Sequence, residues 1–163
     1  MVRNDFSTAS LDISMNRITF KIIKKHKYNS GCESSLVNIL IDDKPLAKIM
    51  KAYEMPMATK EGHPDLAGGY HAIEVLSSLE KYYLGKDKAD WGDEKNKTAL
   101  LGCECGAVGC WPLLCKISLQ GNEVIWSEFE QPHRDDDWDY SAFEGFVFEK
   151  QQYLKAIDAM KNA

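Results

Sequence analysis

The sequence contains no long hydrophobic run. Its N-terminus lacks the apolar stretch of a secretory signal, and no segment approaches the roughly 20 apolar residues that a membrane-spanning helix needs. We therefore expect a cytoplasmic protein without a membrane partner, in a compartment where thiols stay reduced. The five cysteines are an odd number, which argues against a framework in which every cysteine is paired in a disulfide.

Basic residues do not outnumber acidic ones. The 20 Lys and Arg residues stand against 25 Asp and Glu residues, so the net charge is −5. This balance disfavours nucleic acid or an anionic membrane as a partner. The Gly-x-Ser-x-Gly, Walker, His-Glu-x-x-His and dinucleotide signatures do not occur either. Their absence removes the commonest enzyme classes, but it leaves open whether the protein is an enzyme.

Short strand patterns, mostly arranged as hairpins, are what the sequence does contain. Strands are predicted over residues 11–15, 18–22, 36–41, 98–101, 111–119, 123–130 and 145–149. Helices are predicted over residues 45–56, 73–84 and 150–161. Because the helices do not alternate with the strands, the predicted fold is α+β. It would be an antiparallel sheet built from hairpins, with two or three helices packed on it, in a single domain of residues 1–163.

Prolines and glycines set the predicted limits of the first two helices. Pro45 suits the first helical turn, with Asp43 or Lys44 as the cap, and Pro56 is expected to end that helix. Gly85 is expected to cap the second helix at its C-terminus.

The turn at Gly121-Asn122 predicts the register of the hairpin formed by the strands predicted over 111–119 and 123–130. A two-residue loop there would pair Leu119 with Val124. The same register, continued outward, places Cys110 opposite His133. The sequence therefore predicts that the cysteine-rich segment lies beside the segment that contains His133.

The same register assigns faces to three further residues. Cys115 falls in an apolar row and is interpreted as a small buried side chain. Glu128 and Glu130 would fall on the apolar face, which is an unusual place for carboxylates. Either a β-bulge rotates them outward or they line a polar site.

Three of the five cysteines fall within eight residues. Cys103 and Cys105 are two residues apart, so their sulfurs point the same way on an extended chain, and the following glycines allow Cys110 to return toward them. With His133 they would make a Cys₃His tetrahedral zinc site. Zinc motifs usually separate their cysteines by two to four residues, so the Cys-x-Cys spacing argues against this hypothesis.

Two other interpretations of this loop stay open. The cysteines would simply pack as small apolar side chains in a glycine-rich connection between strands. Alternatively, one thiol would act in redox chemistry or as a nucleophile, with His133 or Arg134 as the cation that lowers its pKa. No Cys-x-x-Cys motif of the thioredoxin type is present.

Other polar residues are weaker candidates. His63 and His71 lie near glycines and would either supply ligands from across the fold or stay solvated. Asp135 to Asp137 lack the alternate spacing of a calcium loop and are interpreted as a solvated turn. The basic run Lys21 to Lys27 is interpreted as a strand edge that faces solvent.

The cysteine loop and the residues downstream resemble a family of small uncharacterised bacterial proteins, with the pattern GCxCGxxGCWPL followed by W-x-x-F-x-x-PHR. The likeness covers residues 98–160. It is carried by Leu100–Leu114, Val124–Phe129, Gln131–Arg134, Trp138–Ser141 and Phe146–Glu149, with Tyr153. The resemblance implies a bacterial source and one structural unit containing the cysteine loop and the Pro-His-Arg segment. It implies no activity, cofactor or substrate.

Three functions are compatible with these observations. The first is a non-enzymatic binding or interaction module with its site where the Cys103–Cys110 loop meets His133 and Arg134. The second is a zinc-dependent or thiol-dependent enzyme at the same site. The third is a small acidic protein of the antidote or immunity type that masks a basic protein partner, as the negative charge suggests.

Overall fold

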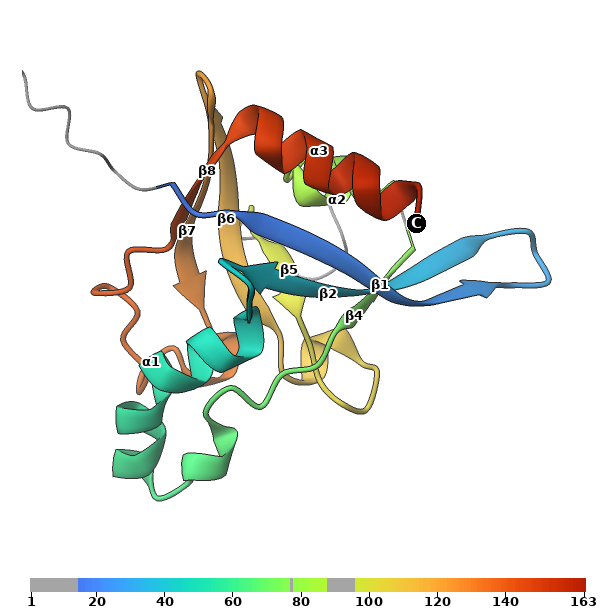
Figure 1. The fold of residues 1–163 in the computed structure, drawn as a ribbon. Helices are drawn as coiled ribbons and strands as arrows, with labels where there is room; N and C mark the ends of the chain where they lie inside the picture. The colour runs from blue at the N-terminus through green and yellow to red at the C-terminus, as the bar shows by residue number, and fades with distance from the viewer. Residues whose placement is uncertain (1–14, 77, 88–95) are drawn as a thin grey trace, which may run out of the picture.

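Two antiparallel sheets of four strands each form the framework of the structure, a computed structural model that describes residues 15–76, 78–87 and 96–163 (Figure 1). The first sheet contains β1 (Ile18–Lys27), β2 (Glu33–Ile41), β3 (Lys44–Pro45) and β4 (Ile73–Val75). The second contains β5 (Thr98–Leu101), β6 (Leu113–Gln120), β7 (Glu123–Glu130) and β8 (Phe146–Glu149). The α-helices are α1 (Leu46–Glu61), α2 (Leu79–Tyr83) and α3 (Lys150–Lys161). The α+β class is confirmed, although the strands divide into two sheets.

Strand β2 is the centre of the first sheet. It pairs with β1 along one side, while β3 and β4 pair with its two ends along the other side. The strand predicted over 18–22 therefore exists, but it extends to Lys27 and pairs with β2. Residues 11–14 of the strand predicted over 11–15 lie outside the described residues. The free end of the β1–β2 hairpin projects from the body of the molecule (Figure 1).

The second sheet follows the predicted hairpin register near its turn. Leu119 pairs with Val124, and further pairs follow as far as Lys116 and Ser127. Glu128 then has a positive φ of 52°, and the register shifts so that Leu114 pairs with Glu130. This bulge was one of the two predicted alternatives.

The bulge turns Glu128 to the surface. Its carboxylate lies 3.8 Å from the Lys116 ammonium group. Glu130 is only partly exposed, and its carboxylate forms an ion pair of 3.2 Å with Lys97. Cys115 is fully buried, as predicted.

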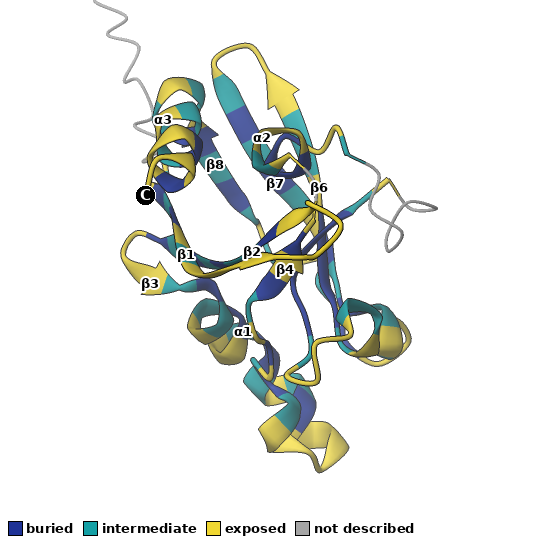
Figure 2. Cartoon of the chain, turned by 90° about the vertical axis from the view of Figure 1, so that its right-hand side faces the viewer, coloured by how far each residue is buried: buried dark blue, intermediate teal, exposed yellow. Residues whose placement is uncertain are grey.

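Both sheets and all three α-helices contribute to one apolar core. Tyr153 of α3 lies at its centre, where its hydroxyl accepts a hydrogen bond from Trp126 Nε1 (3.1 Å) and donates one to the Tyr83 carbonyl (2.5 Å). Phe20 of β1 packs against the rings of Tyr83 and Tyr153. The outward faces of α1 and α3 are exposed, whereas their inward faces are buried (Figure 2). Among the described residues, none of the helices has the length and apolar composition needed to span a bilayer.

The prediction for the first helix was wrong at both ends. Pro45 is the N-cap itself, so Asp43 and Lys44 precede the helix instead of capping it. Pro56 lies inside α1, which continues to Glu61 and ends where Gly62 adopts a φ of 85°. A proline removes one backbone hydrogen bond from a helix, and here the packing of residues on both sides of it outweighs that loss.

The helix predicted over 73–84 was wrong in its first half, whereas α2 lies within its second half and ends before Gly85, as predicted. Ile73–Val75 form β4 because their alternating side chains bury Ile73 and Val75 while β4 pairs with one edge of β2. Helix α2 begins only at Leu79, after Ser78, whose hydroxyl accepts a hydrogen bond from the Lys81 backbone N–H.

Candidate metal centre

The cysteine loop joins β5 to β6, and its first end is fixed to the segment before β4. Gly102 and His71 exchange two backbone hydrogen bonds, each of 2.9 Å. A Cβ atom on Gly102 would lie 2.9 Å from Ile73 Cγ2 and 3.3 Å from Val108 Cα. The loop can approach the first sheet this closely because position 102 has no side chain.

Two successive turns fold the loop back on itself. The Gly106 N–H donates to the Cys103 carbonyl (3.1 Å), and Gly106 has a φ of 88°, which glycine adopts without strain. A single 3₁₀ turn, η3 (Val108–Cys110), follows, and the Cys110 N–H donates to the Ala107 carbonyl (3.1 Å). The predicted return of Cys110 toward the other two cysteines is confirmed.

This folding brings three sulfur atoms together. Those of Cys103, Cys105 and Cys110 all lie within 4.8 Å of one another. Tetrahedral zinc–thiolate bonds of about 2.3 Å would place sulfurs roughly 3.8 Å apart, so a small contraction would suit them to one ion. Cys105 and Cys110 are exposed and Cys103 is partly exposed. An ion can therefore reach the sulfurs directly from solvent.

Hydrogen bonds within the loop make its thiols unequal. The pKa of Cys103 is lowered, first by a hydrogen bond from the Cys105 backbone N–H and then by bonds from the Cys105 and Cys110 thiols. The same contact with Cys103 is the largest cause that raises the pKa of Cys110, to about 11. The cationic neighbours predicted from the sequence are not among the causes of either shift. The thiolate form of Cys103 is thus the one that the hydrogen bonds of the loop favour.

The second end of the loop contacts η4 (Pro132–Arg134), so the two segments lie side by side as predicted, although the register shifts at the bulge before it reaches them. His133 Nε2 lies 2.8 Å from the Gly109 carbonyl, and its ring is stacked on Trp111 with centroids 6.2 Å apart. His133 therefore lies beside the loop, but it is not a member of the three-sulfur group. Its role as a metal ligand stays a prediction.

Arg134 is directed toward α1. Its Nε atom lies 2.8 Å from Glu61 Oε1, and its guanidinium carbon lies 5.1 Å from the centre of the Trp111 ring. Trp138 Nε1 donates to the other Glu61 oxygen (3.0 Å). These contacts give Arg134 a role in holding the 131–138 segment against α1.

A buried polar network behind the loop escaped the sequence analysis. Gln131 Nε2 donates to the Pro112 carbonyl (3.0 Å) and to the Tyr70 hydroxyl (3.5 Å). Tyr70 and Tyr140 in turn donate to Oε2 of Glu54 at 2.8 and 3.1 Å. Glu54 is fully buried, and burial is the largest cause that raises its pKa, to about 7. Helical spacing places Glu54 on α1 but does not show which face is buried.

The remaining sequence candidates are not drawn into the sulfur group. His71 Nε2 lies 3.9 Å from Glu104 Oε2 at the edge of the loop, and both side chains are largely exposed. His63 precedes η1 (Pro64–Leu66), and Asp135 to Asp137 lie at the surface beyond η4. Among the described residues, Cys103, Cys105 and Cys110 are the one group of three or more potential ligands whose donor atoms lie so close together.

No family model, curated protein or solved structure matches this chain. The resemblance to a bacterial family stays a prediction, and the function is argued from the residues of the loop.

Proposed function

We propose that this protein is a non-enzymatic zinc-binding module of the cytoplasm, in which Cys103, Cys105 and Cys110 hold the ion as thiolates. The observation that carries the proposal is the approach of three sulfur atoms to within 4.8 Å of one another. Thiolates are the ligands that select zinc and other soft ions in proteins.

The hydrogen bonds of the loop support this proposal. Hydrogen bonds from the Cys105 and Cys110 thiols are directed toward the Cys103 sulfur and lower its pKa. A zinc ion would replace the protons of those thiols and draw the same three sulfurs to one centre. Backbone hydrogen bonds of the loop itself hold the turns at Gly106 and η3, which bring the three sulfurs together.

His133 is the proposed fourth ligand. In zinc sites one imidazole nitrogen binds the ion while the other donates its proton to a carboxylate or a backbone carbonyl. In this structure Nε2 of His133 lies 2.8 Å from the Gly109 carbonyl, which can only accept a hydrogen bond. This contact favours the tautomer in which Nε2 carries the proton and Nδ1 is unprotonated. Four protein ligands would leave no open position for a reacting water, which favours binding over catalysis.

A zinc titration of the reduced, metal-free protein tests the proposal. We expect one zinc ion per chain in competition with a chromophoric chelator. Serine variants of Cys103, Cys105 and Cys110 should each weaken binding by more than about 100-fold, the upper end of the loss expected for a second-shell partner.

Cys32→Ser is the matched control because Cys32 is an exposed cysteine at the end of the β1–β2 hairpin, outside the sulfur group. It should bind zinc as the unaltered protein does. Unchanged zinc binding by Cys110→Ser would contradict the three-sulfur site. Unchanged binding by His133→Ala would contradict only the fourth ligand.

A further inference from the structure

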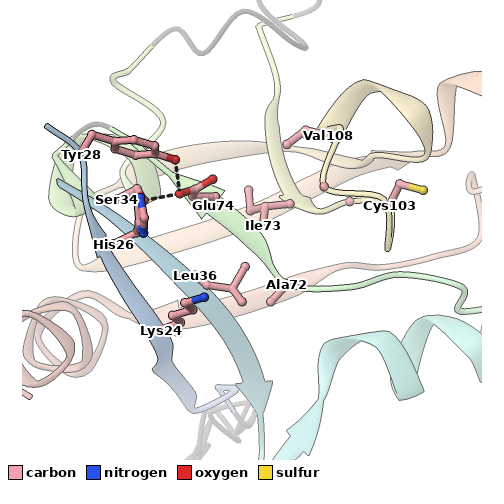
Figure 3. Close-up of a pocket in the computed structure, with 12 residues that line it drawn as sticks. Lys24, His26, Tyr28, Ser34, Leu36, Ala72, Ile73, Glu74, Cys103 and Val108 are labelled. Carbon is pink, nitrogen blue, oxygen red and sulfur yellow. Dashed lines mark hydrogen bonds between the residues drawn. The ribbon is translucent and has the colours of Figure 1, made fainter. Parts of the chain in front are cut away.

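A cleft lies beside the cysteine loop, between that loop, β4 and the projecting end of the β1–β2 hairpin (Figure 3). It has a volume of about 280 Å³, near the lower end of the range for small-molecule sites. Cys103 belongs both to the lining of the cleft and to the sulfur group, but Figure 3 shows its sulfur directed away from Glu74. Binding of a small molecule beside Glu74 needs no metal ion.

A β-bulge in β1 creates the charged wall of this cleft. Before the bulge, Ile22 pairs with buried Val37, and after it Lys24 pairs with Leu36. Val37 and Leu36 are successive residues and point to opposite faces of β2. The extra residue, Ile23, thus turns Lys24 away from the core.

The strand registers then place opposite charges on that outer face. Leu36 pairs with Lys24 on one side and with Glu74 on the other, so these three residues form a row across β1, β2 and β4. The next pair on this face of β1 and β2 is His26 with Ser34. Lys24 and Glu74 thus face the same small space from β1 and β4, the strands on either side of β2.

The Glu74 carboxylate is held in place and stays ionised. One of its oxygens, Oε1, accepts hydrogen bonds from the Tyr28 hydroxyl (2.7 Å) and from Ser34. These bonds lower the pKa of Glu74, with Ser34 the larger cause, and the charges of His26 and Lys24 lower it further. The other oxygen points away from the two hydroxyls (Figure 3).

Apart from Cys103, the remaining lining is apolar or backbone. Leu36, Ile73 and Val108 supply aliphatic surface, and the glycines at 102 and 106 bring the loop backbone to the opposite rim. The Glu74 carboxylate would repel a simple anion, and the Lys24 ammonium group would repel a simple cation. A molecule that carries both charges and a small apolar group is complementary to the charged and the apolar parts of the lining.

We propose that this cleft binds a free α-amino acid. Its ammonium group would bind Glu74, its carboxylate would bind Lys24, and an apolar side chain would lie against Leu36, Ile73 and Val108.

Nuclear magnetic resonance titration with L-leucine tests the proposal, with the other apolar L-amino acids as a panel. We expect shifts of the backbone signals of residues 24, 36, 74 and 108. Isoamylamine and 4-methylpentanoate are leucine without its carboxylate and without its ammonium group. Each should bind at least about tenfold more weakly, since each loses a charged hydrogen bond.

Charge variants give the second part of the test. Glu74→Gln and Lys24→Met should each weaken binding by about tenfold or more. Glu33→Gln and Lys27→Met change the same charges on the same hairpin but outside the cleft lining, and should bind as the unaltered protein does.

Several results would overturn the inference. One is the absence of localised shifts with every apolar amino acid at millimolar concentration. Another is binding of the amine or the acid alone as tightly as leucine, which would make the cleft a cation or an anion site. A third is unchanged binding by Lys24→Met, whose exposed position makes a folding defect unimportant. Zinc binding measured on the same samples tests the sulfur site separately.

Discussion

Cys103 and Cys110 differ in acidity although they belong to one sulfur group. Hydrogen bonds lower the pKa of the Cys103 thiol, and the same contacts raise the pKa of the Cys110 thiol to about 11. Because thiolates, not thiols, are the nucleophiles, this difference has a direct chemical consequence.

In metal-free protein near neutral pH, iodoacetamide should therefore alkylate Cys103 before Cys110. Cys115 should react only after unfolding, since it is fully buried and its pKa is raised by burial. Peptide mapping by mass spectrometry at short reaction times measures the order. Alkylation of Cys110 ahead of Cys103 would contradict the hydrogen-bond pattern of the loop.

Glu54 gives a prediction about stability and pH. Its pKa in the folded protein is raised from 4.5 to about 7, so between these values the folded state holds a proton that the unfolded chain has lost. Stability should therefore fall as pH rises through this window and level off above it. Glu54→Gln should flatten that dependence and, above the window, gain at most on the order of 3 kcal/mol relative to the unaltered protein.

Thermal unfolding at about pH 5 and about pH 8 measures this effect, because the two values lie on either side of most of the window. Glu144→Gln, which changes an exposed carboxylate, is the control and should leave the pH dependence unaltered. If Glu54→Gln has the same pH dependence as the unaltered protein, the carboxyl of Glu54 does not titrate as described.

At the level of elements, the β1–β2 hairpin has two parts with different surroundings. Phe20 and Ile39 lie in the core, whereas His26 and Lys27 are exposed beyond the bulge at Ile23. Few apolar contacts support the outer part, so it should open without global unfolding.

Hydrogen–deuterium exchange should therefore be faster for the paired amides of residues 24–27 and 33–35 than for those of residues 18–22 and 37–41. Mass spectrometry of overlapping peptides measures the contrast. Equal protection along the whole hairpin would show that the outer part is stabilised by contacts that its burial does not reveal.

Local patterns predicted those elements whose neighbours in the chain are also their neighbours in space. Strands β6 and β7 are separated by only two residues, so the turn between them sets their register. β4 pairs instead with β2, far upstream, and its three residues are too few to distinguish a strand from a helix by periodicity. The extension of α1 through Pro56 likewise depends on tertiary packing.

The two candidate sites differ in the same respect, namely whether their residues are close together in the sequence. The three cysteines lie within eight residues, so their spacing and the glycines between them predicted the sulfur group. The charged cleft combines Lys24 with Glu74, which are distant in sequence and meet through two strand pairings and a bulge. No local signal contains that information.

For the whole molecule, one core shared by both sheets implies cooperative unfolding. Phe20 belongs to the first sheet but contacts Tyr83 and Tyr153, and Tyr153 in turn contacts Trp126 of the second sheet. Phe20→Ala should lower the free energy of unfolding by about 3–5 kcal/mol. Urea curves from tryptophan fluorescence and from far-ultraviolet circular dichroism should shift together.

Ile23→Ala is the control because this side chain is 59% exposed, and its effect should stay within about 0.5 kcal/mol. Two separate transitions in the Phe20→Ala protein would indicate that the sheets unfold independently.

X-ray absorption at the zinc edge of the zinc-loaded protein counts the atoms bound to the ion and identifies them by element. We expect three sulfur atoms at about 2.3 Å and one nitrogen at about 2.0 Å. A first shell of nitrogen and oxygen alone, or one containing fewer than three sulfurs, would contradict it.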